Sequence, residues 1–300
     1  MFDDASSTDD ESPRTTTRRR LLAGTATLAT VGLAGCTASV LESRTRTVER
    51  AVDAAAVDRV VVDEATDDVA IRIADDDRVH VLAEKHAVGG TDLDAFTLHT
   101  ETAGRTLRVS TDRPRVVGFG GGSVPIRLRV PAGVGVDRVE TADGALDLAD
   151  TAGDATLSTG DGDVAVRGHD GDLDVETADG SVSIEGVDGR VSVETADGNV
   201  RLVDVATVGT VETADGSVVV GVDHLEAPAT IHTADGEVQV RLGANVSAVL
   251  DAETADGRVV GMGVAGGVET ASETRFVGSV GGGGPRLTIR TGDGDIVLSR

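Results

Sequence analysis

The 300-residue sequence contains no tryptophan and no tyrosine, and its aromatic residues are four phenylalanines. Sites for sugars and for nucleic acid bases commonly use aromatic side chains as stacking platforms, so this composition disfavours both. Any hydrophobic core must be thin and built from small aliphatic side chains. Lys85 is the only lysine, and no basic patch offsets the formal net charge of −25. Nucleic acid and anionic lipid headgroups are therefore disfavoured as partners.

Acidic residues dominate the charge, with 52 Asp and Glu against 27 Lys and Arg. This balance, with Arg in place of Lys, is typical of proteins from extreme halophiles, where strong salt screening makes a high surface charge tolerable. A disordered acidic chain is the alternative interpretation. It is disfavoured because Val, Leu and Ile recur in ordered alternation with polar residues.

The N-terminus has the pattern of an export signal. Arg18 and Arg19 precede an uncharged stretch at 21–35, which is shorter than the roughly 20 residues that a membrane-spanning helix needs. A positive flank followed by a short apolar run indicates a signal peptide, and the arginine pair resembles a twin-arginine signal. We therefore expect residues 1–35 to be a signal peptide.

Cys36 is the only cysteine, which excludes an internal disulfide. The sequence Leu-Ala-Gly-Cys at 33–36 resembles a lipoprotein box, in which the cysteine is lipidated and becomes the first mature residue. A buried thiol is the alternative. We expect lipidation at Cys36, a lipid-anchored tether at 36–50, and a location on the outer face of the cytoplasmic membrane. One lipid chain binds membranes weakly, so stable anchoring requires a multi-chain lipid.

A repeated pentapeptide, Glu-Thr-Ala-Asp-Gly or a close variant, organises the rest of the chain. Its threonine falls at Thr141, Thr159, Thr177, Thr195, Thr213, Thr233, Thr254, Thr270 and Thr291. The first four gaps are 18 residues each, and the others range from 16 to 21. Helical repeats need units of roughly 33 residues or more, so the period indicates β-structure.

Each unit contains two short runs of alternating residues, such as 181–184 and 190–193, separated by a glycine-containing turn at 186–189. Two architectures fit: an up-and-down antiparallel sheet, or a coil that winds in one direction. Hairpins would make every turn equivalent, whereas here the similarity returns only after two turns. The pattern therefore favours an all-β, two-sided β-solenoid of about 18 residues per coil over 136–300, each lap adding one rung.

The pentapeptide is expected to form the corner of each lap. Asp-Gly is a strong turn pair, because glycine accepts positive φ and aspartate bonds its own downstream backbone. The alanine is small enough to sit inside a tight corner, and the threonines would form a hydroxyl ladder. The copy at 269–273 lacks Asp-Gly, so we expect a distorted lap there. The glycine runs at 118–122 and 281–284 indicate loops.

Residues 51–135 alternate in the same way but without the repeat. We expect them to form an N-terminal β region that caps the solenoid, because an open end of a stack would expose unpaired strand edges.

The run Ile-Arg-Leu-Arg-Val-Pro-Ala-Gly at 126–133, followed by the threonine, Asp-Gly and valine rungs, resembles the "putative adhesin" family of unknown function found in bacterial and archaeal surface proteins. The resemblance covers roughly residues 48–300. It implies a β-solenoid on the cell surface, and it implies no catalytic residues.

The motif aspartates are the candidate site residues: Asp143, Asp161, Asp179, Asp197, Asp215, Asp235 and Asp256. Stacked carboxylates would repel one another, so the stack should depend on salt or on bound cations. An oxygen-rich ladder could bind Ca²⁺ or monovalent cations. However, the calcium-binding Gly-Gly-x-Gly-x-Asp pattern is missing. Turn aspartates on a halophilic surface are therefore favoured, with no cofactor and no metal site.

An active site finds no support in the sequence. Paired carboxylates serve glycoside hydrolysis, and some such enzymes are β-helices, but uniform rungs of 18 residues leave no room for a cleft. The six histidines lack metal-ligand spacing, and His169 and His224, both at turns, are expected to be solvated.

The sequence thus predicts a non-enzymatic, lipid-anchored surface scaffold or adhesin-like interaction module. Its expected partners are the membrane, through the lipid on Cys36, and a surface protein or a second copy of the chain. A cation-binding surface protein that uses the aspartate ladder is the alternative, and a polysaccharide-acting enzyme is a third, weaker one.

Overall fold

The computed structural model describes residues 43–114, 120–264 and 267–300. Most of this part of the chain is β-strand. Its only helices are two three-residue 3₁₀ turns, η1 (Ala54–Ala56) and η2 (Leu93–Ala95). Among these residues no helix has the length and apolar character needed to cross a membrane.

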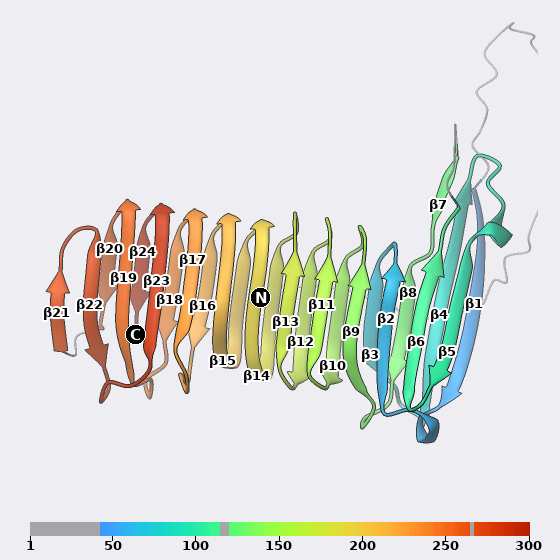
Figure 1. The fold of residues 1–300 in the computed structure, drawn as a ribbon, viewed down its shortest axis with the longest axis horizontal. Coiled ribbons are helices and arrows are strands. Elements are labelled where there is room, and N and C mark those ends of the chain that lie inside the picture. Colours follow the sequence, from blue (N-terminus) through green and yellow to red (C-terminus); the bar gives the residue numbers. More distant parts are fainter. Residues whose placement is uncertain (1–42, 115–119, 265–266) are drawn as a thin grey trace, which may run out of the picture. The chain divides into compact units, whose positions relative to one another are not determined.

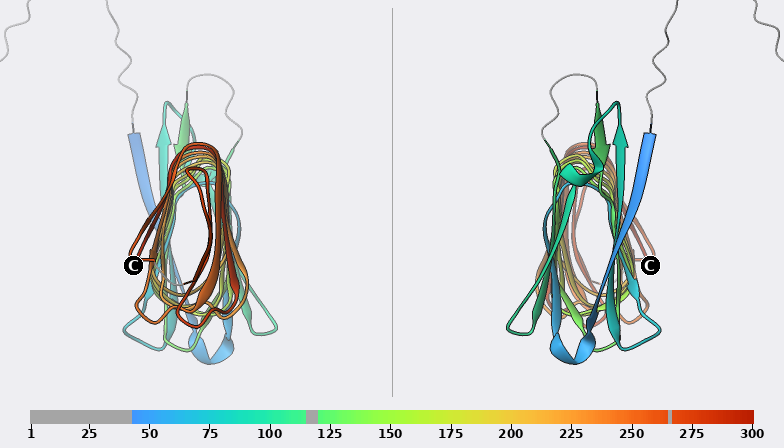
Figure 2. Two further views of the ribbon diagram at one scale, coloured as in Figure 1. Left: turned by 90° about the vertical axis from the view of Figure 1, so that its left-hand side faces the viewer. Right: turned by 90° about the vertical axis from the view of Figure 1, so that its right-hand side faces the viewer.

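The strands form two facing layers, which we call face A and face B, joined by the turns of a flattened coil (Figures 1 and 2). Face A contains, in spatial order, β5 (Thr97–Ala103), β6 (Thr106–Asp112), β2 (Arg59–Ala65), β9 (Gly135–Thr141), β11 (Ala155–Thr159), β13 (Leu173–Thr177), the second halves of β14 (Val182–Asp197) and β15 (Val200–Asp215), β17 (Ala229–Asp235), β23 (Arg286–Asp293), β19 (Ala248–Asp256), β22 (Arg275–Val280) and β21 (Gly267–Ala271).

Face B contains, in spatial order, β1 (Ser43–Asp53), β4 (Arg78–Val88), β8 (Ile126–Val130) with β7 (Gly121–Ser123) above it, β3 (Val69–Ile73), β10 (Leu146–Ala152), β12 (Val164–Asp170), the first halves of β14 and β15, β16 (Val218–Val222), β18 (Val238–Leu242), β24 (Ile296–Ser299) and β20 (Val259–Met262).

Consecutive laps pair in parallel with residues of the same kind in register. On face B, Leu146 lies beside Val164, Val164 beside Val182, and Val182 beside Val200. Backbone-to-side-chain hydrogen bonds between successive corners likewise join residues 18 apart. The two-sided, all-β solenoid predicted from the repeat is confirmed.

The core is a thin layer of small aliphatic side chains between the two faces. Strand alternation sends every second residue inward, and Ile184, Leu202 and Val220 are at most 1% exposed. Valine dominates this layer because its β-branched side chain packs well on a pleated surface. The absence of tryptophan and tyrosine is therefore compatible with one continuous core.

The order of the laps in space differs from their order in the sequence at both ends. The last lap of the chain, β23 and β24, lies between the β17–β18 lap and the β19–β20 lap: Ile289 pairs with both Ile231 and Ala252. At the other end β2 lies between β6 and β9. The prediction that each lap adds one rung in chain order is wrong there. Because each of these laps lies between two others, both of its edges are hydrogen-bonded to a neighbour. A lap at the end of the stack would instead have one unpaired edge.

Antiparallel strands occupy the ends of the stack. β1 pairs only with β4, and the exposed strand carries Arg44, Arg46 and Arg50, charges that discourage pairing with another chain. At the opposite end the copy without Asp-Gly forms β21, which pairs antiparallel with β22, so this lap departs from the repeat as expected. Part of the glycine segment predicted as a loop at 118–122 forms β7.

Candidate interaction surface

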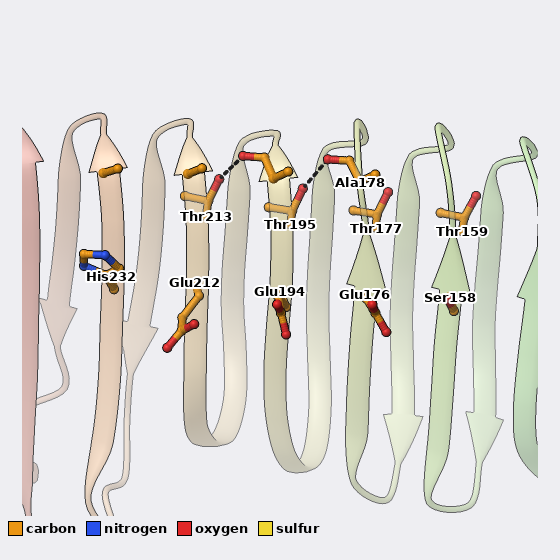
Figure 3. A pocket seen from close by; sticks show the side chains of 13 residues that line it. Ser158, Thr159, Glu176, Thr177, Ala178, Glu194, Thr195, Glu212, Thr213 and His232 are labelled. Atoms are coloured by element: carbon orange, nitrogen blue, oxygen red, sulfur yellow. Dashed lines mark hydrogen bonds between the residues drawn. The ribbon is translucent and has the colours of Figure 1, made fainter.

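The motif threonine points into the core and joins one lap to the next. Thr195 is 4% exposed, and its hydroxyl donates to the carbonyl oxygen of Gly180 in the preceding lap, at 3.3 Å. Thr177 and Thr213 make the equivalent bonds to Gly162 and Gly198. Figure 3 shows Thr177, Thr195 and Thr213 in neighbouring strands. The predicted hydroxyl ladder is thus a ladder of hydroxyl-to-carbonyl bonds, which satisfies a buried corner carbonyl in each lap.

The motif glycine is required by close packing between laps. A Cβ added at Gly162, Gly180 or Gly198 would meet the carbonyl of the glycine one lap earlier well inside 3.0 Å, a distance that real Cβ atoms essentially never show. These three glycines do not have positive φ. The reason given from the sequence, tolerance of positive φ, is therefore wrong at these positions, and the absence of a side chain is what the corner needs.

The motif alanine also differs from expectation. Ala178, Ala196 and Ala214 are exposed on the outside of the corner, although the sequence suggested a position inside it. Alternation explains the difference: the preceding threonine points inward, so the alanine must point outward.

The motif aspartates are exposed and stacked in register, as the repeat predicts. Asp197 lies beside Asp215, and Asp215 beside Asp235. The next member is Asp293, which the inserted C-terminal lap places between Asp235 and Asp256. Of the other predicted members, Asp143, Asp161 and Asp179 occupy the same corner in the three laps before Asp197 and are exposed.

Crowding of carboxylates is strongest near Asp235. Partial desolvation, followed by the like charges of Asp293 and Asp215, raises the pKa of Asp235 above its usual value. Even so, no group of three or more His, Cys, Asp or Glu side chains in the described part of the chain is arranged to hold a metal ion.

The residue after the motif glycine has a structural role in the laps where it is Asp or Asn. The carboxylate of Asp163 accepts a hydrogen bond from the backbone amide of Ser181 in the next lap, at 2.9 Å. Asp172 does the same for Arg190 at the opposite corner. These acidic side chains therefore satisfy backbone donors that the corners leave outside the sheet ladders.

A groove runs across several laps on the outside of face A, between the exposed alanines and a column of outward-pointing side chains (Figure 3). It has a volume of about 550 Å³. The column consists of Ser158, Glu176, Glu194, Glu212 and His232. We call this the face A groove.

The three glutamates of this column make no ion pair with any residue that the structure describes. They belong to the same pentapeptide as the aspartates, and the sequence interpretation missed them because it considered only the turn. Alternation was the available signal, since an inward threonine places the preceding glutamate outward. Uniform rungs were expected to leave no room for a cleft, yet the flat face carries a shallow groove.

His169 is buried, contrary to the expectation of a solvated histidine at a turn. It is 3% exposed, its Nε2 donates to the carbonyl oxygen of Gly153 at 2.7 Å, and its Nδ1 accepts from the hydroxyl of Thr151 at 2.9 Å. Burial lowers the pKa of His169, with partial opposition from the Gly153 carbonyl and from the nearby Asp170 and Asp154. The imidazole of His169 is therefore neutral, and it packs in the turn at the end of β12.

A second charged cluster lies near the C-terminal end of face A. Asp251 is 9% exposed, and its carboxylate contacts Arg275, Arg286 and Arg290 at 3.0–3.5 Å. Three arginines around one buried carboxylate compensate its desolvation. This cluster joins β19 to β22 and β23.

Cys36, Arg18 and Arg19, the residues of the predicted lipid anchor and export signal, lie outside the described residues. Their assignment remains a prediction from the sequence.

Comparison of the chain with known proteins identifies its family and several solved structures that resemble it. No curated protein matches the chain significantly. Among solved structures, a "putative adhesin" from Bacteroides fragilis NCTC 9343 is similar, with 10% identity, a TM-score of 0.48, and coverage of 84% of this chain and 97% of that one. A "putative lipid binding protein" from Parabacteroides distasonis ATCC 8503 has 15% identity and a TM-score of 0.39, with 85% and 96% coverage.

The family comparison covers most of the described chain. The model of Toastrack DUF4097 matches residues 57–299, which include every lap of the solenoid and the strands at its ends apart from β1. The chain belongs to the Toastrack DUF4097 family.

Proposed function

We propose that the protein is an exported, lipid-anchored surface scaffold that binds a macromolecular partner along face A and has no catalytic role. The observation that carries the proposal is the face A groove, where identical side chains repeat lap after lap and three carboxylates have no ion-pairing partner in the described chain. A repeating groove suits an extended partner, because each lap offers the same contact one rung further along.

The chemistry of the repeat supports an architectural role for the rest of the motif. The threonine and the glycine are each engaged in joining laps. The outward glutamates and the exposed aspartates other than Asp143, which pairs with Arg113, are left to contact a partner. The names of the similar solved structures, "putative adhesin" and "putative lipid binding protein", are consistent with a surface role.

An adhesion assay on the source organism tests the proposed surface. Strains would lack the gene, or express the wild-type chain, or express the triple variant Glu176→Gln/Glu194→Gln/Glu212→Gln. The matched control, Asp170→Asn/Asp188→Asn/Asp204→Asn, removes the same charge from exposed positions at the opposite corner. We expect the deletion and the glutamate variant to reduce adhesion and the control to preserve it. Equal adhesion of the deletion strain and the wild type would refute the function, and equal loss in both triple variants would refute the site.

A second experiment tests the anchor. Replacement Cys36→Ser should release the chain from the membrane fraction and abolish incorporation of a labelled lipid, and Arg18→Lys/Arg19→Lys should keep the chain inside the cell. Retention of lipid label in the Cys36→Ser variant would show that the anchor lies elsewhere.

A cation-binding role for the aspartate column is the second candidate, and the raised pKa of Asp235 favours it because a bound cation would relieve the same crowding. Metal-specific stabilisation at fixed ionic strength separates the two proposals.

A further inference from the structure

Face B carries a groove of its own, on the side of the molecule opposite the face A groove. Its volume is about 430 Å³, and its floor is formed by β15, β16, β18 and β24. Volumes of about 300–1,000 Å³ are typical of small-molecule sites. Three arginines line it, Arg201, Arg241 and Arg300, in a chain whose net charge is −25. Arg300 donates to the carbonyl oxygen of Ala244 at 2.6 Å, so the candidates for binding a ligand are the other two. We call this groove the face B groove.

The hollow at the centre of this groove exists because Gly221 has no side chain. In register, Gly221 lies directly beside Arg241, and Val219 lies directly beside Arg201. A Cβ added at Gly221 would meet no atom closer than 3.8 Å, which is ordinary van der Waals contact, and its φ is not positive. The backbone therefore does not require glycine here, in contrast to the motif glycines. Glycine inside a strand weakens it and often marks close approach of a ligand.

The two arginines are free to bind an anion. Within the residues that the structure describes, neither Arg201 nor Arg241 makes an ion pair or a side-chain hydrogen bond. They stand on the two strands that flank β16, offset by two residues along the strand and roughly 12 Å apart at the backbone, and both line the same groove. The long side chains of Arg201 and Arg241 can bring their guanidinium groups together over Gly221. The planar guanidinium group matches the geometry of a carboxylate.

The remaining lining selects the type of anion. Val219 lies beside Arg201, and Val297 lies on β24 with Gln239 between the two valines in register. Both valines offer apolar surface within the groove, which suits an aliphatic body. Asp204 and Asp223 also line the groove and disfavour ligands that carry several negative charges, such as phosphates.

We propose that the face B groove binds a small monocarboxylate with an aliphatic body, with its carboxylate held by Arg201 and Arg241 over Gly221 and its carbon chain on Val219 and Val297. This site is independent of the partner surface proposed on face A.

Calorimetric titration of the full chain with potassium octanoate, at ionic strength fixed with KCl, tests the proposal. The wild type should give a saturable isotherm. Replacement Gly221→Gln places a side chain in the hollow, and Arg201→Gln/Arg241→Gln removes both guanidinium groups. Each should weaken binding at least about ten-fold, which for the arginine variant is the contribution of charge-assisted hydrogen bonds. 1-Octanol, which lacks the charge, and acetate, which lacks the body, should bind at least about ten-fold more weakly than octanoate.

Two controls isolate the groove. Ser183→Gln adds the same side chain at another outward position on face B, and Arg129→Gln removes an exposed arginine that makes no ion pair in the described chain. Both should bind octanoate within about two-fold of the wild type. Absence of saturable binding, equal binding of octanol, unchanged affinity in Gly221→Gln, or equal loss in Arg129→Gln would overturn the proposal. The arginine pair is on the surface, so the double variant gives a result even if Gly221→Gln impairs folding.

Discussion

Replacement of one motif glycine by alanine gives the sharpest test of how the laps are joined. In Gly198→Ala the new Cβ would lie 2.8 Å from the carbonyl carbon of Gly180 and closer still to its oxygen, whereas ordinary contact begins at 3.4 Å. The two laps must therefore separate locally, by roughly an ångström, which is the kind of shift that overpacking forces on a core. The same shift stretches the bond from the Thr195 hydroxyl to Gly180, already 3.3 Å long.

The expected cost follows from these two effects. Overpacking costs about 1–3 kcal/mol, and loss of one buried hydrogen bond about 1 kcal/mol, so Gly198→Ala should lower the free energy of unfolding by about 2–4 kcal/mol. The matched control is Gly221→Ala, whose Cβ would meet nothing closer than 3.8 Å. It should leave stability unchanged or raise it by about 0.4–1 kcal/mol, because alanine restricts the unfolded chain.

Urea unfolding of both variants, followed by circular dichroism at fixed salt, measures the difference. If Gly198→Ala is as stable as Gly221→Ala, close packing of the corners is not what the repeated glycine provides. Solenoids can unfold in parts, so the comparison uses the first transition that each variant shows.

Two further predictions concern titrating side chains. Because the folded-state pKa of His169 is lowered, the unfolded chain binds a proton first, and stability should fall as pH drops below about 6.5 toward the folded-state pKa. The double variant Thr151→Val/His169→Val continues the valine column of the neighbouring laps and should lose this dependence; an unchanged pH profile of the melting midpoint would contradict the assignment. Because the pKa of Asp235 is raised, its charged form destabilises the fold, and this penalty appears as pH rises through the folded-state pKa. Asp235→Asn should raise the melting midpoint at neutral pH, and by more at low salt than at high salt, because salt screens the like charges of Asp293 and Asp215 but not the desolvation. Asp174→Asn, flanked by Thr156 and Ser192, should not raise it; equal midpoints for Asp235→Asn and the wild type at low salt would argue against crowding.

The periodic part of the fold could be predicted because one local rule repeats. Each lap has the same inward threonine, the same corner glycine and the same alternation, so the period of the pentapeptide determines the architecture of the central laps. The roles of the individual residues in each corner were harder to predict from the sequence. Three motif glycines (Gly162, Gly180 and Gly198) and the motif alanine were assigned the wrong reason, since the sequence shows that a turn occurs but not how closely the next lap approaches it.

The ends of the stack could not be predicted, because their pairing is not local. Nothing in the sequence of β23 indicates that it enters between β17 and β19, although placing Asp293 there completes the aspartate column. Lys85 is a similar case: it lies on the core-facing side of β4 at 8% exposure, a position that composition alone would not assign to the only lysine.

The groove on face A could have been found from alternation, whereas the groove on face B could not. Glu194 must point outward if Thr195 points inward, so the glutamate column follows from the motif. Arg201 and Arg241 lie outside the shared motif, in laps spaced by 18 and 20 residues on either side of β16, so only the register reveals that they approach each other.

The central claim is that the repeated pentapeptide builds corners and presents a surface, and that its aspartates are not a metal site. Thermal unfolding of the protein, at ionic strength held high with KCl and with or without millimolar Ca²⁺, tests it most directly. The account predicts a midpoint that rises with total salt and does not change when Ca²⁺ replaces K⁺ at constant ionic strength. A large rise with Ca²⁺ alone would show that the aspartate column binds metal and would contradict the account.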